Sequence, residues 1–205
     1  MTIHLHHGDL PDGLKFPGGA AIAVDTETLG LNLTRDRLCL VQLSADGAEF
    51  HLVKIAAGQP AAPNLKRLLE DPARLKIFHY ARFDLAMLKR GLGIAVGPVY
   101  CTKVASRLVR TYTDRHGLKD LCRELLDVDL SKQQQSSNWG ADALSEAQLA
   151  YAAADVQHLH ALRAKLDDML ARTGRDALAA ACFAFLPTRA ELDLAGWGEE
   201  DIFSH

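Results

Sequence analysis

The chain has 205 residues, of which 48% are hydrophobic, and this is enough for one domain with a sizeable core. The formal net charge of −3 excludes the strongly basic surface of proteins that hold long nucleic acids, so any nucleic-acid partner must be bound locally. The longest apolar run, residues 177–186, falls short of the roughly 20 residues that a membrane span needs, and the first residues lack a secretion signal. We therefore expect a cytoplasmic protein that does not span a membrane.

The first half of the chain predicts a meander of strands followed by alternating helices and strands. The apolar runs at 20–27, 37–45 and 48–55 are typical of strands, and Asp46-Gly47 between the last two is a strong hairpin signal. They predict three antiparallel strands. The helix, strand and helix expected next span 64–72, 75–80 and 82–93.

The second half is mainly helical in its spacing. We expect a strand at 99–102, an ordered polar loop at 129–142, and one helix at 144–173 that starts after Ser145 as N-cap and stops at Gly174. The two further helices expected in this half span 103–112 and 118–126. The predicted fold class is a mixed α/β sheet flanked by helices.

Cysteine and histidine spacing argues against a zinc site or a disulfide framework. The cysteines form no CxxC pair and have no matching histidine spacing, which predicts reduced and mostly buried thiols. His4, His6 and His7 resemble a metal cluster, but we identify no acidic or cysteine partner that would complete a site, so we expect no functional metal site there. The four cysteines are Cys39, Cys101, Cys122 and Cys182.

Two carboxylates, Asp25 and Glu27, follow the apolar run of the first expected strand. Residues two apart in a strand point to the same face, so these like charges lie side by side. Their repulsion is relieved when one carboxylate takes a proton or when both share a cation.

Three further residues can join this pair. Asp84 opens a predicted helix, while Tyr151 and Asp155 lie four apart and therefore share one helix face. Each of these features is common by chance, but together they provide four carboxylates that a central sheet can gather. Hard oxygen ligands suit Mg²⁺ or Mn²⁺, and two such ions would stabilise both the attacking and the leaving oxygen of a phosphodiester displacement. Tyr151 would orient or deprotonate the attacking water.

The chain resembles the DEDD 3'-5' exonucleases, in the tyrosine-bearing branch that includes ribonuclease D, through three ordered segments: AVDTETLGL, HYARFD and YAAAD. The segment LSKQQQSSNW also resembles that branch. The resemblance covers about residues 20–170 and implies a ribonuclease H-like fold, with 171–205 as a helical extension and tail of the same domain.

The resemblance also implies roles for single residues. Asp25, Glu27, Asp84 and Asp155 become ligands of two divalent metal ions, Tyr151 serves the nucleophilic water, and Glu27 also meets the terminal 3'-hydroxyl. Leu31 matches the leucine that wedges between the last two bases in relatives. His79 stands where many relatives have asparagine, which leaves substrate contact and strand-end packing open, and Asn138 replaces a common aspartate.

The compact size, the HYARFD variant and the ending GWGEEDIFSH resemble the nano-RNase C subgroup of short-oligonucleotide exonucleases. The length left after Asp155 has no room for the helical domains that ribonuclease D adds. This resemblance implies release of nucleoside 5'-monophosphates from RNAs a few residues long, including dinucleotides. It also implies a ring-like homo-oligomer such as an octamer.

Two segments are candidates for further substrate contacts. The polar loop offers Lys132, Gln135 and Trp139, and the basic region 103–119 offers Tyr112, Arg115 and His116. The alternative is that Trp139 packs the loop down and that the cations are solvated. The tail carries Trp197, Ile202 and Phe203, which we expect to dock on a neighbouring subunit, because exposed aromatic residues are otherwise a liability.

The leading hypothesis is thus a two-metal 3'-5' exoribonuclease that acts on short RNA. An enzyme of the same chemistry that acts on longer RNA or on DNA is the alternative, since metal ligands do not report substrate length. An inactive ribonuclease H-like binding or scaffold protein is a third hypothesis. It predicts missing ligands, whereas all four carboxylates and the tyrosine are present.

Overall fold

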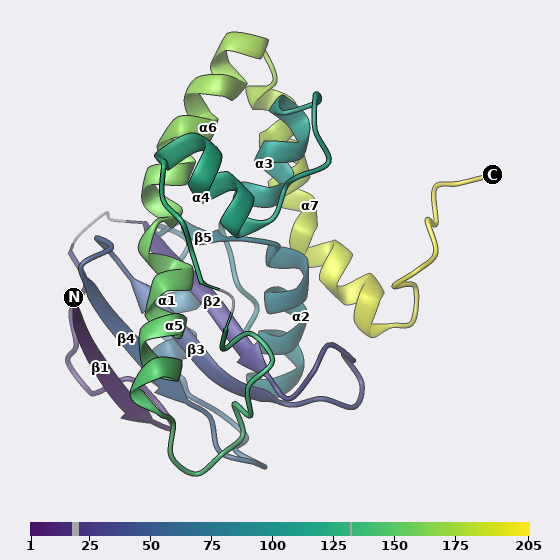
Figure 1. The fold of residues 1–205 in the computed structure, drawn as a ribbon. Helices are drawn as coiled ribbons and strands as arrows, with labels where there is room; N and C mark the ends of the chain where they lie inside the picture. Colours follow the sequence, from purple (N-terminus) through teal and green to yellow (C-terminus); the bar gives the residue numbers. More distant parts are fainter. Residues whose placement is uncertain (18–20, 132) are drawn as a thin grey trace.

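The computed structural model describes residues 1–17, 21–131 and 133–205. A six-stranded sheet forms its centre, in the order β1-β4-β3-β2-β5-β6 (Figure 1). β2, β3 and β4 are antiparallel, as the meander predicted, whereas β5 and β6 continue the sheet parallel to β2. The strands span Thr2–His7 (β1), Ile22–Thr28 (β2), Leu38–Ser44 (β3), Glu49–Lys54 (β4), Lys76–Phe78 (β5) and Val99–Cys101 (β6).

The helices cover the sheet and extend beyond one end of it. α5 crosses β2, β3 and β4, while α3, α4, α6 and α7 gather above the sheet in Figure 1. The helices span Pro63–Leu69 (α1), Ala81–Leu92 (α2), Thr102–Val109 (α3), Leu118–Leu126 (α4), Glu146–Gln157 (α5), Leu159–Thr173 (α6) and Asp176–Leu194 (α7). The predicted mixed α/β fold is confirmed. Within the described residues, no helix combines the length and apolarity that a membrane crossing requires.

The first strand, β1, is absent from the sequence-based prediction. It pairs in parallel with β4 and places His4 opposite His51. The rings of His4, His6 and His51 stack, and His6 Nε2 lies 3.0 Å from His51 Nδ1. His4 Nε2 lies 2.8 Å from Glu49 Oε1, an acidic neighbour that only the fold supplies.

The long helix expected at 144–173 is two helices. α5 ends and α6 begins at His158, whose backbone angles of φ −103° and ψ 0° depart from the helix. The break lets α5 pack on the sheet while α6 packs on α3 and α4. The expected ends are confirmed: Ser145 accepts from the backbone N–H of Gln148 in a capping box, and Gly174 has φ 63°.

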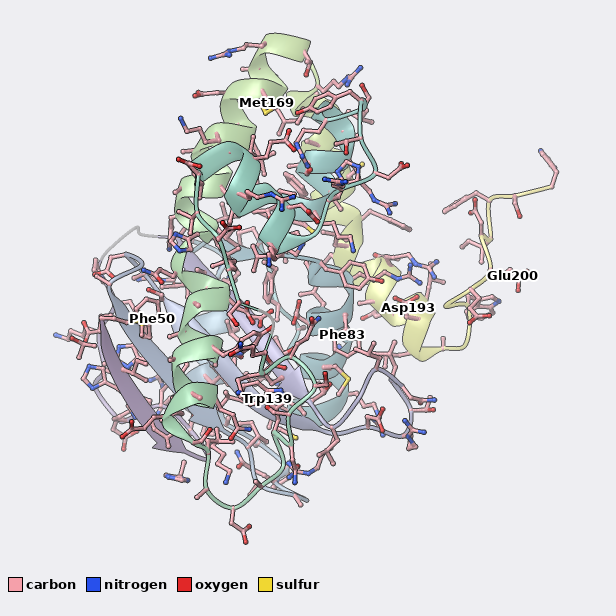
Figure 2. All side chains as sticks on the ribbon, in the orientation of Figure 1. Phe50, Phe83, Trp139, Met169, Asp193 and Glu200 are labelled. Carbon is pink, nitrogen blue, oxygen red and sulfur yellow. The ribbon has the colours of Figure 1, made fainter. Side chains whose placement is uncertain are left out.

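α7 ties the second half of the fold to α2. Asp193, 8% exposed, forms ion pairs with Arg82 of α2 and with Arg189 one turn before it. Figure 2 places Asp193 at the end of α7 and Glu200 on the tail that projects from the body. Arg82 and Arg189 also donate to the carbonyl of Gly198, so the start of this tail is fixed to the helix that carries Asp84.

Candidate active site

The five residues predicted to be catalytic line one cavity of about 640 Å³. Asp25 and Glu27 come from the end of β2, Asp84 from the first turn of α2, and Tyr151 and Asp155 from α5. The apolar start of β2 is fully buried, which fixes the strand in the core and leaves its two carboxylates at the cavity wall. Strand and helices thus bring together residues that are far apart in sequence.

Three of the carboxylates lie close enough to share an ion. Oxygens of Asp25, Glu27 and Asp155 all lie within 4.8 Å of one another. Asp84 lies beside them and accepts a hydrogen bond of 2.6 Å from the hydroxyl of Thr26, while Gln42 Nε2 lies 3.3 Å from Asp25 Oδ2.

Burial and mutual repulsion disfavour the charged forms of this cluster. Burial, followed by the charges of Asp84, Asp155 and Glu27, raises the pKa of Asp25 well above its ordinary value. Burial, followed by the charges of Asp155 and Asp84, raises the pKa of Glu27 to about 9. Burial likewise raises the pKa values of Asp84 and Asp155 to about 7.

The side chains present therefore fit a divalent cation. Carboxylates packed this closely carry either protons or a cation, and oxygen donors are those that Mg²⁺ and Mn²⁺ prefer. In the part of the chain that the structure describes, no other group of three or more acidic, histidine or cysteine side chains gathers in this way. Burial, with the charge of Asp155 next, raises the pKa of Tyr151, so its phenol is protonated at neutral pH.

Some of the predicted substrate contacts line the cavity, and Trp139 does not. Leu31, which is 83% exposed, lines the cavity together with His79 and Gln135. His79 Nδ1 lies 2.9 Å from the hydroxyl of Thr102, and burial, with Lys103 nearby, lowers its pKa to about 3, so this imidazole is neutral. Lys132 lies outside the described residues.

Trp139 does not line the cavity. Its side chain is 1% exposed and packs with Cys39, Leu40 and Leu52 in a second core cluster beneath α5. Figure 2 places it between α5 and the preceding loop, and its ring centre lies 6.0 Å from that of Tyr151. This packing corrects its assignment as a substrate contact and favours the alternative that it holds the loop down.

The basic segment also differs from the prediction. The Tyr112 hydroxyl donates to Glu124, and His116 Nδ1, which is buried, lies 2.9 Å from Ser106 Oγ. The backbone carbonyl of Arg115 accepts a hydrogen bond from the buried guanidinium of Arg110. None of these three candidates lines the cavity. Two other residues of the basic region 103–119, Lys103 and Lys119, do line the cavity, and so does Tyr80, which the sequence did not single out.

Comparison with known proteins identifies the family of this chain. A family model described as 3'-5' exonuclease matches residues 12–171. Ribonuclease D of Gluconacetobacter diazotrophicus is 37% identical over 154 residues, which cover 75% of this chain and 39% of that protein. The chain thus spans about two fifths of the length of the curated ribonuclease D relatives that it matches.

Similar solved structures are also found, two of them over the whole of this chain. Brucella melitensis NrnC with bound Mg²⁺ has a TM-score of 0.94 and 56% sequence identity, over 100% of both chains. The same protein bound to pGG has a TM-score of 0.94 and 57% identity, over 100% of this chain and 99% of that one. Escherichia coli RNase D has a TM-score of 0.74 and 27% identity, over 84% of this chain and 45% of that one. With these matches and its ribonuclease H-like fold, the chain belongs to the 3'-5' exonuclease family.

Proposed function

We propose that this exonuclease releases nucleoside 5'-monophosphates from the 3' ends of short RNAs, including dinucleotides. The observation that carries the proposal is the convergence of four carboxylates, Tyr151 and the exposed Leu31 in one cavity. A cavity of about 640 Å³ can hold the terminal nucleotides of an RNA. The likeness to Brucella NrnC, a protein solved with pGG, supports the same substrate class.

Asp25, Glu27 and Asp155, with Asp84 beside them, would hold two divalent ions such as Mg²⁺ or Mn²⁺. These ions, when bound, neutralise charge that develops on the phosphoryl oxygens. Glu27 would in addition contact the terminal 3'-hydroxyl of the substrate.

Tyr151 would position the attacking water. Burial, followed by the charges of Asp155 and Glu27, raises the pKa of Tyr151, and this keeps the phenol protonated. A protonated phenol orients water through its oxygen lone pairs, which favours orientation over deprotonation. Leu31 would separate the last two bases, because its exposed side chain lines the same cavity.

We also propose that the protein assembles with copies of itself. Trp197, Ile202 and Phe203 are 44%, 43% and 74% exposed on a tail that leaves the body (Figure 1). Phe185 of α7, also exposed, lies with its ring centre 6.2 Å from that of Phe203. An apolar surface of this kind is typical of an interface, and a ring of subunits would cover it.

The test is hydrolysis of a 5'-labelled ribodinucleotide by the purified protein with Mg²⁺ or Mn²⁺. We expect conversion to nucleoside monophosphates that stops with EDTA and falls at least about a hundredfold in Asp155→Asn, which removes one ligand charge. A folded wild-type protein that leaves the dinucleotide intact with either metal would contradict the proposal. A DNA dinucleotide run in parallel separates RNA from DNA preference.

A further inference from the structure

The backbone at Tyr80 is in a conformation that few side chains adopt. Tyr80 is the N-cap of α2 and has φ 70° and ψ 42°, in the left-handed region. Only two residues, His79 and Tyr80, connect β5 to α2, so the chain must turn sharply there. Glycine takes these angles freely and asparagine takes them readily, whereas a bulky aromatic residue is a genuine outlier.

Packing does not account for the tyrosine. Tyr80 is 45% exposed, so burial offsets the unfavourable backbone conformation only in part. Its exposed part lines the catalytic cavity, four residues before Asp84. Unfavourable backbone conformations of this kind persist at sites where the side chain has a task.

Lys103 fixes the orientation of the ring. Its Nζ lies 4.0 Å from the centre of the Tyr80 ring, within the range of a cation–π contact. Among the described residues, Lys103 forms no ion pair with a carboxylate, and it also lines the cavity. The ammonium group therefore lies over one face of the ring, and the 45% exposure of Tyr80 leaves ring area for a flat partner.

We propose that Tyr80 is a substrate-binding residue whose ring, held on one face by Lys103, stacks with the other face on a nucleobase of the bound RNA. Aromatic side chains stack on bases of any sequence, because every base has a π-face. Leu31 and Tyr80, both exposed and both in the cavity lining, would then contact the two bases of a dinucleotide. This inference rests on the proposed function and adds a base-binding residue to it.

The main variant is Tyr80→Gly, which removes the ring and relieves the backbone. We expect thermal unfolding at the same or a higher temperature, together with a KM for a ribodinucleotide that rises about 5- to 100-fold. Tyr80→Phe keeps the stack and should hold KM within about threefold of the wild-type value. Tyr80→Asn, which also tolerates the left-handed region, serves if the glycine variant does not fold.

Asp127→Gly is the matched control. Asp127, the C-cap of α4, is the other described non-glycine residue with positive φ, at 56°, and it lies outside the cavity. Asp127→Gly should relieve a similar unfavourable backbone conformation and leave the KM for a dinucleotide unchanged. An unchanged KM in folded Tyr80→Gly, or an equal loss in Tyr80→Phe, would overturn the proposal.

The role of Lys103 is tested in a double-mutant cycle. Lys103→Met should raise KM in the wild-type protein but add little in the Tyr80→Gly background, since it acts through the ring. Additive effects would overturn the assignment of Lys103 as a positioning residue.

Calorimetric binding of the dinucleotide to Asp155→Asn protein, with and without Tyr80→Gly, separates this inference from the proposed function. Weaker binding by the double variant than by Asp155→Asn alone supports stacking of Tyr80 on a base, whatever the rate of hydrolysis. If the wild-type enzyme hydrolyses the dinucleotide and folded Tyr80→Gly has the same KM, only this inference is contradicted and the proposed function stands.

Discussion

At the residue scale, the acidic cluster could be predicted because its signals are local. Asp25 and Glu27 share a strand face, and Tyr151 and Asp155 share a helix face, so their spacing alone predicts which side chains cooperate. Tyr80 and Lys103 carry no such signal. Their contact depends on a left-handed residue and on the approach of α2 to α3, which only the folded chain specifies.

Trp139 is a residue whose local sequence signal suggested a role that its burial does not support. A tryptophan in a polar loop beside a catalytic helix suggests a substrate contact, but burial depends on how α5 and the sheet enclose the loop. Gln148 of α5 donates to the hydroxyl of Ser137 and to the carbonyl of Asn138, and this anchors the loop over the core.

We expect replacement of the buried Trp139 ring to affect stability more than catalysis. Trp139→Ala should destabilise the protein by about 3–5 kcal/mol, because it leaves a large cavity in the core. Trp139→Phe fills most of the space and should leave the KM for a dinucleotide unchanged. Chemical unfolding and steady-state kinetics measure these effects. A raised KM in a fully folded Trp139→Phe protein would indicate that Trp139 does contact the substrate.

At the element scale, the helices and the meander follow from local patterns, whereas β1 and the break at His158 do not. β1 is short and rich in histidine, and it becomes a strand by pairing with β4 at the edge of the sheet. The break at His158 has no glycine or proline signal and arises because α5 and α6 pack on different surfaces.

The stacked histidines make this edge sensitive to acid. Burial, followed by the other histidines, lowers the pKa values of His6 and His51, while Glu49 and Asp46 act in the opposite direction on His51. Depressed pKa values mean that the unfolded chain binds more protons than the folded one. Their contribution to stability is thus present above the unfolded value of about 6.5 and is lost as pH falls below it.

We therefore predict that the urea midpoint of unfolding falls between about pH 7.5 and 5.5, partly because of this stack. His6→Gln, which removes one titrating ring from the partly exposed edge, should reduce that fall. His205→Gln is the control, because His205 is exposed on the tail and lies outside the stack. Equal pH slopes in the wild-type protein and in His6→Gln would contradict this account.

At the scale of the whole molecule, the apolar tail is the feature that the single chain leaves without a partner surface. Arg82 and Arg189 fix Gly198, but Ile202 and Phe203 beyond it are exposed. Exposed aromatic residues are costly in water, so the pattern of the tail predicts that it docks on a neighbouring subunit.

Deletion of residues 196–205 should lower the oligomer mass measured by light scattering. Ile202→Ser combined with Phe203→Ser should have the same effect, because it removes apolar area and keeps the contacts of Gly198. The control combines Glu199→Gln and Glu200→Gln on the same tail. If the mass stays unchanged in both the deletion and the serine variants, the tail is not an assembly contact.

The central claim, that this exonuclease acts on short RNA, is tested most directly by substrate length. The purified protein would be given 5'-labelled RNAs of two, four, seven and twenty nucleotides with Mg²⁺ or Mn²⁺, and kcat/KM would be measured for each. We expect the dinucleotide to be converted to monophosphates with the highest kcat/KM and the twenty-mer to be attacked more slowly. Efficient trimming of the twenty-mer while dinucleotide accumulates would contradict the claim and would point to longer RNA or DNA as the substrate.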